Sequence, residues 1–102
     1  MGKRENKVET YLHDEIVKLG GTTRKWVCPG HDGVPDRIII MKCGVMFVEV
    51  KTTDGEYEPS QEREHERLRQ AGAAVHTVWG HLGVDVLIEQ IKKSLSNEEE
   101  HF

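Results

Sequence analysis

Gly33-Val34-Pro35-Asp36-Arg37 and Phe47-Val48-Glu49-Val50-Lys51 are the two stretches that decide the fold of this chain. Together they read as a lone aspartate followed, after a gap, by Glu-x-Lys inside an apolar strand. Acids in apolar surroundings must be paired, bound to metal or neutralised. At an effective dielectric constant near 20, two carboxylates ~5 Å apart repel by roughly 3 kcal/mol. A divalent cation would remove that repulsion, and Lys51 alone would offset part of it.

Both stretches are predicted to lie in a β-hairpin. The sequence favours one strand from Asp36 to Met41 and a second from Val45 to Lys51, joined through Met41-Lys42-Cys43-Gly44. Apolar residues occupy consecutive positions in both, which is typical of strands covered on both faces. We therefore expect the pair to lie centrally in its sheet.

The register of this hairpin decides whether the two acids can meet. The alternation of side chains puts Glu49 and Lys51 on one face and Val50 on the other. Pairing of Ile40 with Val45 would set Asp36 opposite Glu49, close enough to share an ion. A shift by one residue would instead split the acids across the sheet. The metal hypothesis therefore predicts the first register, or a distortion near Pro35 with the same effect.

The remaining elements follow from apolar periodicity and from Gly and Pro positions. A first helix is expected over 3–19, ended by Gly20-Gly21, and a last one over 84–95 after a turn at 80–83. Between them we expect a strand over 22–27, a loop over 28–33, a charged helix from Pro59-Ser60 to Gln70 with Ser60 as N-cap, and a strand over 75–79. The order is α-β-β-β-α-β-α.

Length and composition narrow the class of protein. The 102 residues suit one domain over 1–96, and the last residues, 97–102, read as an acidic, solvated tail. The net charge of −4 does not indicate a nucleic-acid binder and does not exclude one. The modest apolar content makes dimerisation a reasonable way to bury more surface. No apolar run reaches the length of a membrane span, and no secretion signal is visible.

Cysteines and histidines do not indicate a structural metal site. Cys28 and Cys43 lack the spacing of metal ligands, and without an export signal they favour a reduced, cytoplasmic setting. The six histidines are scattered and lack His-x3-His spacing. His31 and Asp32 in the loop are expected to be simply exposed.

The succession of helix-Glu, strand-Asp, strand-Glu-x-Lys, helix and strand resembles the PD-(D/E)xK nuclease superfamily. Within it, the chain is most similar to the virus-type replication-repair nuclease family, VRR-NUC. The matching motifs are 33–37, 47–51, and Ser60-Gln61 followed by 66–72. The resemblance runs from Glu5 to about Ile91, and the motifs in this order are fairly specific. It implies an α/β, restriction-endonuclease-like core with a mixed central sheet flanked by helices.

The resemblance implies metal-dependent hydrolysis of phosphodiester bonds. Asp36, Glu49 and the backbone carbonyl of Val50 would hold Mg2+ or Mn2+, which prefer oxygen ligands. Lys51 would orient or help deprotonate the attacking water and stabilise charge on the phosphate. Gln61 would hold the water or Lys51 in place.

A further acid and several basic residues complete the expected site. The family's helix-one glutamate falls on Glu5 or Glu9, of which Glu5 is slightly preferred because it precedes Val8 by three residues; Glu9 precedes Leu12 in the same way. The null hypothesis for both is a solvated acid beside the apolar stripe. Charge alone makes four residues candidates for phosphate contact: Arg24, Lys25, Arg37 and Lys42.

Stand-alone members of the family are small, often phage-encoded, and similar in size to this chain. The resemblance therefore implies a homodimeric, structure-selective endonuclease acting on branched DNA such as four-way (Holliday) junctions, in replication, repair or recombination, within the host cytoplasm. Two alternatives stay open. One is a nucleic-acid-binding module on the same fold with little catalysis, and the other is an interaction protein in which Lys51 and the acids form a buried ion-pair cluster.

Overall fold

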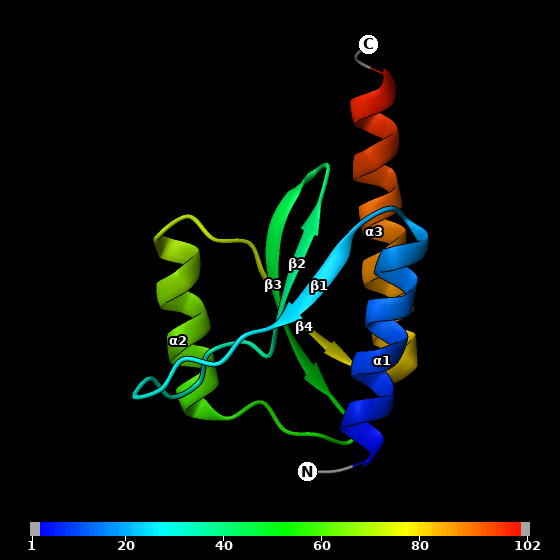
Figure 1. The fold of residues 1–102 in the computed structure, drawn as a ribbon. Helices are drawn as coiled ribbons and strands as arrows, with labels where there is room; N and C mark the ends of the chain where they lie inside the picture. Colours follow the sequence, from blue (N-terminus) through cyan, green and yellow to red (C-terminus); the bar gives the residue numbers. More distant parts are fainter. Residues whose placement is uncertain (1–2, 101–102) are drawn as a thin grey trace.

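The computed structural model describes the backbone of residues 3–100 and the side chains of residues 7–97 (Figure 1). The order of elements is the predicted α-β-β-β-α-β-α. Their bounds are α1 (Lys3–Lys18), β1 (Thr22–Lys25), β2 (Arg37–Met41), β3 (Gly44–Lys51), α2 (Pro59–Gln70), β4 (Val75–Trp79) and α3 (Gly80–Glu100).

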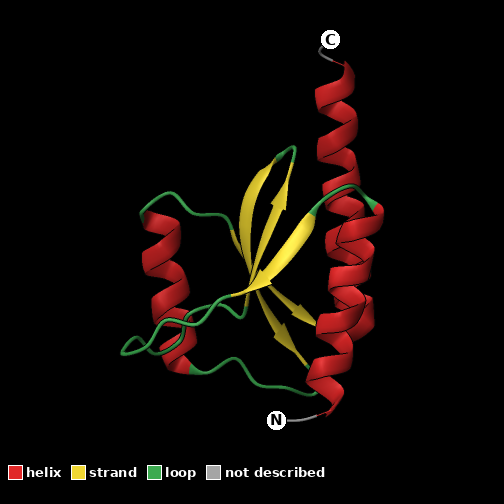
Figure 2. Ribbon diagram, viewed as in Figure 1, coloured by secondary structure: helices red, strands yellow, loops and turns green. Residues whose placement is uncertain are grey.

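The four strands form one mixed sheet in the order β1-β2-β3-β4. β1 is antiparallel to β2, β2 is antiparallel to β3, and β4 runs parallel to β3. Because a parallel pair needs a crossover connection, α2 bridges β3 and β4. The predicted central position of β2 and β3 is confirmed. As Figure 2 shows, α1 and α3 lie together on one side of the sheet, and α2 lies apart on the other side.

The hydrophobic core fills the space between the sheet and the α1–α3 pair. The helices contribute apolar residues at helical spacing, and the strands contribute alternate residues from one face, which is what the two periodicities require. Its buried members are Val8, Leu12, Ile16, Ile39, Met41, Val48, Val50, Val78, Val84, Leu87, Ile88 and Ile91.

The hairpin has the register that brings the acids together. Ile40 pairs with Val45, and the pairing continues to Arg37 opposite Val48. The next step along the same register sets Asp36, directly before β2, opposite Glu49. Residues opposite one another share a face, so Asp36 and Glu49 lie on the face away from α1 and α3.

The largest differences from the sequence prediction lie at three element boundaries, and the others are of one residue. β1 ends at Lys25 rather than Val27. The expected turn over 80–83 is helical instead, because Gly80 adopts a positive φ of 65° that lets the chain pass directly from β4 into α3. The helix also continues to Glu100, beyond the expected end at Leu95.

The predicted N-cap of α2 at Ser60 is wrong: the N-cap is Glu58, with Pro59 as the first helical residue. Proline suits that position because its missing N–H would have no helical partner there. Ser60 is therefore already inside the helix.

No helix in the described part of the chain is long and apolar enough to cross a membrane. The thiols of Cys28 and Cys43 are free.

Candidate active site

Asp36 is fixed at the point where the chain enters β2. Its backbone carbonyl accepts a hydrogen bond from the Trp26 N–H at 2.8 Å, and its carboxylate Oδ2 accepts one from the Val50 N–H at 2.9 Å. Pro35 before it is fully buried. The carboxylate is therefore anchored to β3 on the strand that also holds Glu49 and Lys51.

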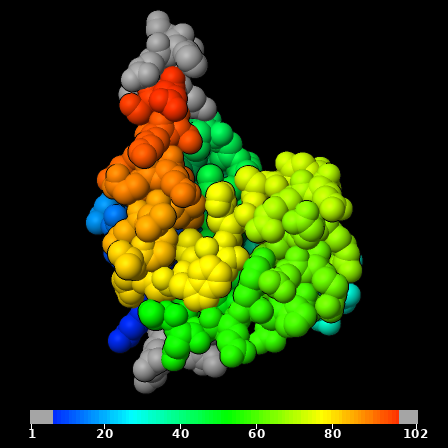
Figure 3. Space-filling model, turned by 180° about the vertical axis from the view of Figure 1, so that it is seen from behind, coloured from blue at the N-terminus to red at the C-terminus, as the bar shows by residue number. Residues whose placement is uncertain are grey.

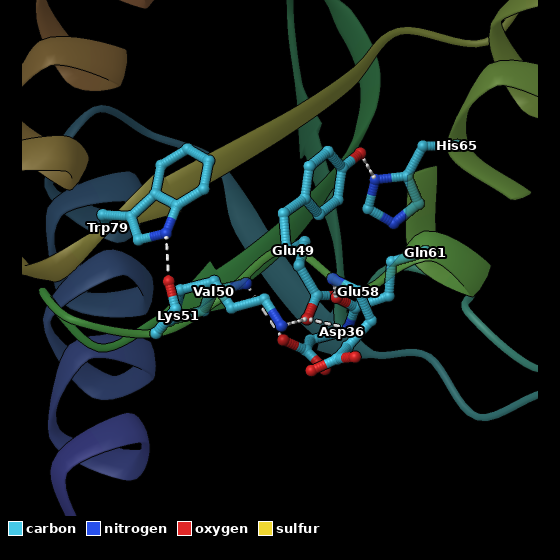
Figure 4. A network of polar contacts seen from close by, with 10 residues as sticks. Asp36, Glu49, Val50, Lys51, Glu58, Gln61, His65 and Trp79 are labelled. Carbon is cyan, nitrogen blue, oxygen red and sulfur yellow. Dashed lines mark hydrogen bonds and ion pairs between the residues drawn. The ribbon is translucent and has the colours of Figure 1, made fainter. Parts of the chain in front are cut away.

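Glu49 and Lys51 lie on β3 with both side chains buried. Lys51 Nζ is 3.6 Å from Glu49 Oε2. Figure 4 shows the Lys51 ammonium group and the carboxylates of Asp36 and Glu49 pointing toward one another. Removing charges from water costs several kcal/mol per ion, so such a buried cluster is weak evidence for stability and better evidence for function.

Gln61 brings α2 to this cluster. Its Nε2 donates a hydrogen bond to Glu49 Oε2 at 2.9 Å, and its Oε1 accepts one from the Glu58 backbone N–H at 3.0 Å. The same side chain therefore caps the helix and orients a site carboxylate. The sequence predicts Gln61 at the site but not its part in the cap, because the pattern favours Ser60 as N-cap.

The Val50 backbone points to the side of β3 where Asp36 lies. Its N–H donates to the Asp36 carboxylate, and the N–H and C=O of one strand residue point the same way. The Val50 carbonyl is therefore directed to the edge that β2 leaves free after Arg37.

The structure does not bring every predicted residue to this cluster. Glu9 forms a buried ion pair with Arg37, with Oε1 and Nε 3.0 Å apart, on the helix-covered face of the sheet. Glu5 belongs to α1, but its side chain lies outside the described residues. Lys42 lies in the turn at the other end of the hairpin, and Lys25 shares the face of Arg37. Arg24 lies on the same face as Asp36.

A second group of contacts fixes the segment between β3 and α2, next to the cluster. The Tyr57 hydroxyl forms a close hydrogen bond with Nδ1 of His65, which is fully buried in α2. Trp79 Nε1 donates to the Gly55 carbonyl at 2.9 Å, which holds the segment between β3 and α2 (Figure 4). Burial lowers the pKa of His65, and the nearby Arg69 lowers it further. The imidazole is therefore held neutral.

The donor set suits a hard divalent cation. Asp36 and Glu49 offer carboxylate oxygens and Val50 a carbonyl oxygen, and Mg2+ is usually held by one or two carboxylates together with waters and substrate phosphates. Among residues with described side chains, no cluster of three or more His, Cys, Asp or Glu could hold a metal. The arrangement thus fits a cation that a phosphate substrate helps to bind, not a closed structural site.

Tyr57, His65 and Trp79 were not singled out by the sequence. They are spread over a loop, a helix and a strand, with no periodic relation between them. The Glu58-Pro59 pair was the one local signal available, since proline at the first helical position places the N-cap just before it.

The chain is similar to known proteins in sequence and in fold. The protein named "Putative nuclease p44", from Acyrthosiphon pisum secondary endosymbiont phage 1, is 42% identical over 73 residues, which are 71% of this chain and 78% of that protein. A solved "VRR_NUC domain" structure is 40% identical, with a TM-score of 0.78, and covers 86% of this chain and 97% of its own. A "VRR_NUC domain protein" shares the fold at 18% identity, with a TM-score of 0.67 over 88% of each chain. No protein-family model matches the chain.

Proposed function

This chain belongs to the VRR-NUC nuclease family, and from that premise we propose that it is a metal-dependent endonuclease that hydrolyses phosphodiester bonds in DNA. The observation that carries the proposal is the convergence of Asp36, Glu49 and Lys51 at one end of the central strand pair β2–β3, with Gln61 held against Glu49. The cation is Mg2+ or Mn2+, held by the two carboxylates and the Val50 carbonyl. Bound there, it lowers the pKa of a water and neutralises charge on the phosphate.

The protein side chains position the reacting groups. Asp36 is aimed by the Val50 N–H, so its carboxylate does not have to be ordered when substrate arrives. Lys51 is buried beside Glu49 and supplies a positive charge to the phosphate oxygens or orients the attacking water. Gln61 fixes Glu49 and, through the cap, fixes its own helix relative to β3.

The substrate proposed is branched DNA, including four-way junctions, cut by a homodimer in the host cytoplasm during replication, repair or recombination. Support for the dimer comes from the modest core of a 102-residue chain and from apolar side chains exposed on the helices, such as Val17 of α1 and Val86 of α3. Two-fold symmetry would suit paired incisions on opposite arms. A net charge of −4 favours recognition of DNA shape over tight nonspecific binding.

The proposal is tested by cleavage assays on a labelled four-way junction, a splayed arm and a plain duplex, each with Mg2+, Mn2+ or EDTA. We expect metal-dependent cutting, with Asp36→Ala and Lys51→Ala each slower by on the order of 100-fold or more, because Asp36→Ala removes a proposed ligand of the cation and Lys51→Ala removes the positive charge proposed to face the phosphate. Asp32→Ala and Lys92→Ala remove the same charges from exposed positions and should cut as the wild type does.

Two results would redirect the assignment. Binding of these DNAs without cutting, with either metal, would favour a nucleic-acid-binding module on this fold. Neither binding nor cutting would favour an interaction protein in which Lys51 and the acids are structural.

A further inference from the structure

The sheet face that holds Asp36 and Glu49 is left partly uncovered. α2 packs on that side mainly against β4 (Figure 3), and its Gln61 reaches Glu49 near the end of β3, while no described helix covers the Ile40–Val45 end of the hairpin there. Ile40 and Val45 pair across the hairpin on this face and are 44% and 54% exposed. Contiguous apolar side chains exposed on a protein surface are typical of interaction sites.

An aromatic pair lies on the same face directly beside the acids. The Trp26 N–H bonds to the Asp36 carbonyl, which places Trp26 across from Asp36. Its ring contacts Phe47, with centroids 4.8 Å apart and planes inclined by 41°. Phe47 is two residues before Glu49 and pairs with Ile38. We call Trp26, Ile38, Ile40, Val45 and Phe47 the aromatic platform.

Two arginines flank the platform although the chain is acidic. Among the 18 acidic residues of the sequence, only Glu49 lies within one of the four strands of the described sheet. Arg24 pairs with Ile38 on the platform face, and its guanidinium group is held there by the Thr22 hydroxyl at 2.7 Å. An exposed arginine thus borders the platform on the β1 side.

A second arginine borders it on the other side. Arg69 of α2 donates to the Val75 carbonyl at 3.1 and 3.3 Å, and Val75 is the β4 neighbour of Phe47. Arg69 is half-exposed and also lies 3.7 Å from Glu66. The row across the sheet therefore runs from one guanidinium group, over apolar and aromatic side chains, to another.

Aromatic side chains on a sheet face, flanked by arginines, are an arrangement that binds unpaired nucleic acid, and Trp26 and Phe47 are partly exposed here. Bases stack on the rings, and the guanidinium groups contact phosphates. Bases in a duplex are already stacked and cannot offer their faces. We propose that the aromatic platform binds unpaired bases of the DNA strand whose phosphodiester lies at Asp36 and Glu49. This inference rests on the proposed nuclease function and gives it a preference for DNA with single-stranded segments at the branch.

The first test uses the tryptophan itself as reporter. Wild-type protein is titrated in EDTA, where no cleavage can occur, with an oligothymidylate and with a blunt duplex. Stacking of thymine on Trp26 should quench the intrinsic fluorescence with the oligothymidylate and not with the duplex. Trp26→Phe should lose most of the quenching, since only Trp79 remains, while it keeps an aromatic ring and binds normally.

The second test measures affinity by anisotropy of the labelled DNAs. Trp26→Leu and Phe47→Leu should each weaken oligothymidylate binding by at least about fivefold, because each removes a stacking surface. Duplex binding should not change. Leu82→Ala, which alters a 77% exposed apolar residue on α3, is the control and should bind both DNAs as the wild type does. The solution mass of each variant is measured alongside.

The proposal is overturned if Trp26 fluorescence does not respond to the oligothymidylate, or if the leucine variants bind it normally. It is also overturned if the leucine variants convert a dimer into a monomer and still bind single-stranded DNA, because a second copy of the chain then covers the platform. If the wild type cuts DNA but the leucine variants bind oligothymidylate normally, the platform proposal is wrong and the nuclease proposal stands. If oligothymidylate quenches the Trp26 fluorescence but the protein never cuts DNA, the platform proposal is supported and the nuclease proposal is wrong.

Discussion

At the residue scale, Gln61 joins two parts of the molecule with the two atoms of one amide. Its Oε1 completes the N-terminal cap of α2, and its Nε2 holds Glu49. Gln61→Ala removes both bonds, and loss of a cap costs about 1 kcal/mol. Gln61→Glu keeps the acceptor for the cap but sets a carboxylate against Glu49.

We therefore predict that the two substitutions separate under urea denaturation. Gln61→Ala should lower the free energy of unfolding by about 1 kcal/mol with or without Mn2+. Gln61→Glu should destabilise the protein in EDTA and regain stability in Mn2+, because a cation relieves the repulsion of the acids. Gln90→Glu adds the same charge at an exposed position on α3 and is the control. An equal response of Gln61→Glu and wild type to Mn2+ would contradict a cation at this cluster.

The site residues differ in how far the sequence could reveal them. Asp36, Glu49 and Lys51 follow from spacing within two strands, because the period of two and one hairpin register fix their faces. The choice between Glu5 and Glu9 could not be made in this way, since both border the same helical stripe. Glu9 pairs with Arg37, a contact between residues 28 positions apart that no local pattern encodes.

At the scale of elements, the segment before β2 is held against the start of α2. Gly33 has a φ of +85°, and a Cβ there would lie 2.4 Å from the Ser60 carbonyl oxygen and 3.0 Å from the Gln61 nitrogen. Gly30 has nearly the same φ, +82°, but a Cβ there would meet nothing within 4 Å. The two glycines therefore form a matched pair that separates backbone strain from a tertiary clash.

Gly33→Ala and Gly30→Ala are both expected to cost about 1–2 kcal/mol for the left-handed conformation. Gly33→Ala should lose at least a further ~1 kcal/mol, because the methyl group displaces backbone of α2. It should also slow cleavage, since Asp36 and Gln61 would move apart, whereas Gly30→Ala should cut normally. Chemical denaturation and single-turnover cleavage measure the two effects. Equal losses in both variants would mean that the contact with Ser60 does not position the site.

Element boundaries were predictable where chemistry is local. The apolar stripe of α1 and the two hairpin strands follow from periodicity alone. The start of α3 at Gly80 could not be predicted from periodicity, because a glycine after a strand is an ordinary turn signal unless its packing is known. Gly83 packs closely on the Val78 backbone, with an added Cβ 3.3 Å from the carbonyl carbon, so this segment is helical and tightly docked.

At the scale of the whole molecule, the distribution of charge explains how an acidic chain can offer a surface to DNA. The acids lie mainly on helices and loops, and Glu49 is the single acid within the four described strands. Arg24 and Lys51 lie on the face of Glu49, whereas Lys25 and Arg37 lie on the helix-covered face. Net charge was therefore a poor guide to the partner, and the sheet had to be assembled before its charge could be seen. The aromatic platform, built from two strands and the residue after β1, was invisible in the sequence for the same reason.

Global stability should depend on pH through two histidines, the fully buried His65 and the half-buried His76. Burial is the main cause that lowers the pKa of both His65 and His76, with Arg69 adding to it. In the unfolded chain both titrate near 6.5, so as the pH falls below about 6.5 the unfolded state takes up protons that the folded state refuses. The free energy of unfolding is then complete above pH 6.5 and declines below it, by at most about 1.4 kcal/mol per pH unit for each histidine.

Urea denaturation between pH 8 and pH 5.5 measures this decline. His65→Asn offers an amide in place of the ring atom that bonds Tyr57, and His76→Gln removes the second group. Each should flatten the dependence, and the double variant should flatten it most, whatever each substitution does to stability at pH 8. Because the contact between Tyr57 and His65 fixes the segment next to the site, cleavage by the wild type should weaken in the same pH range. If the free energy of unfolding of the double variant falls with pH as steeply as that of the wild type, other groups govern the decline.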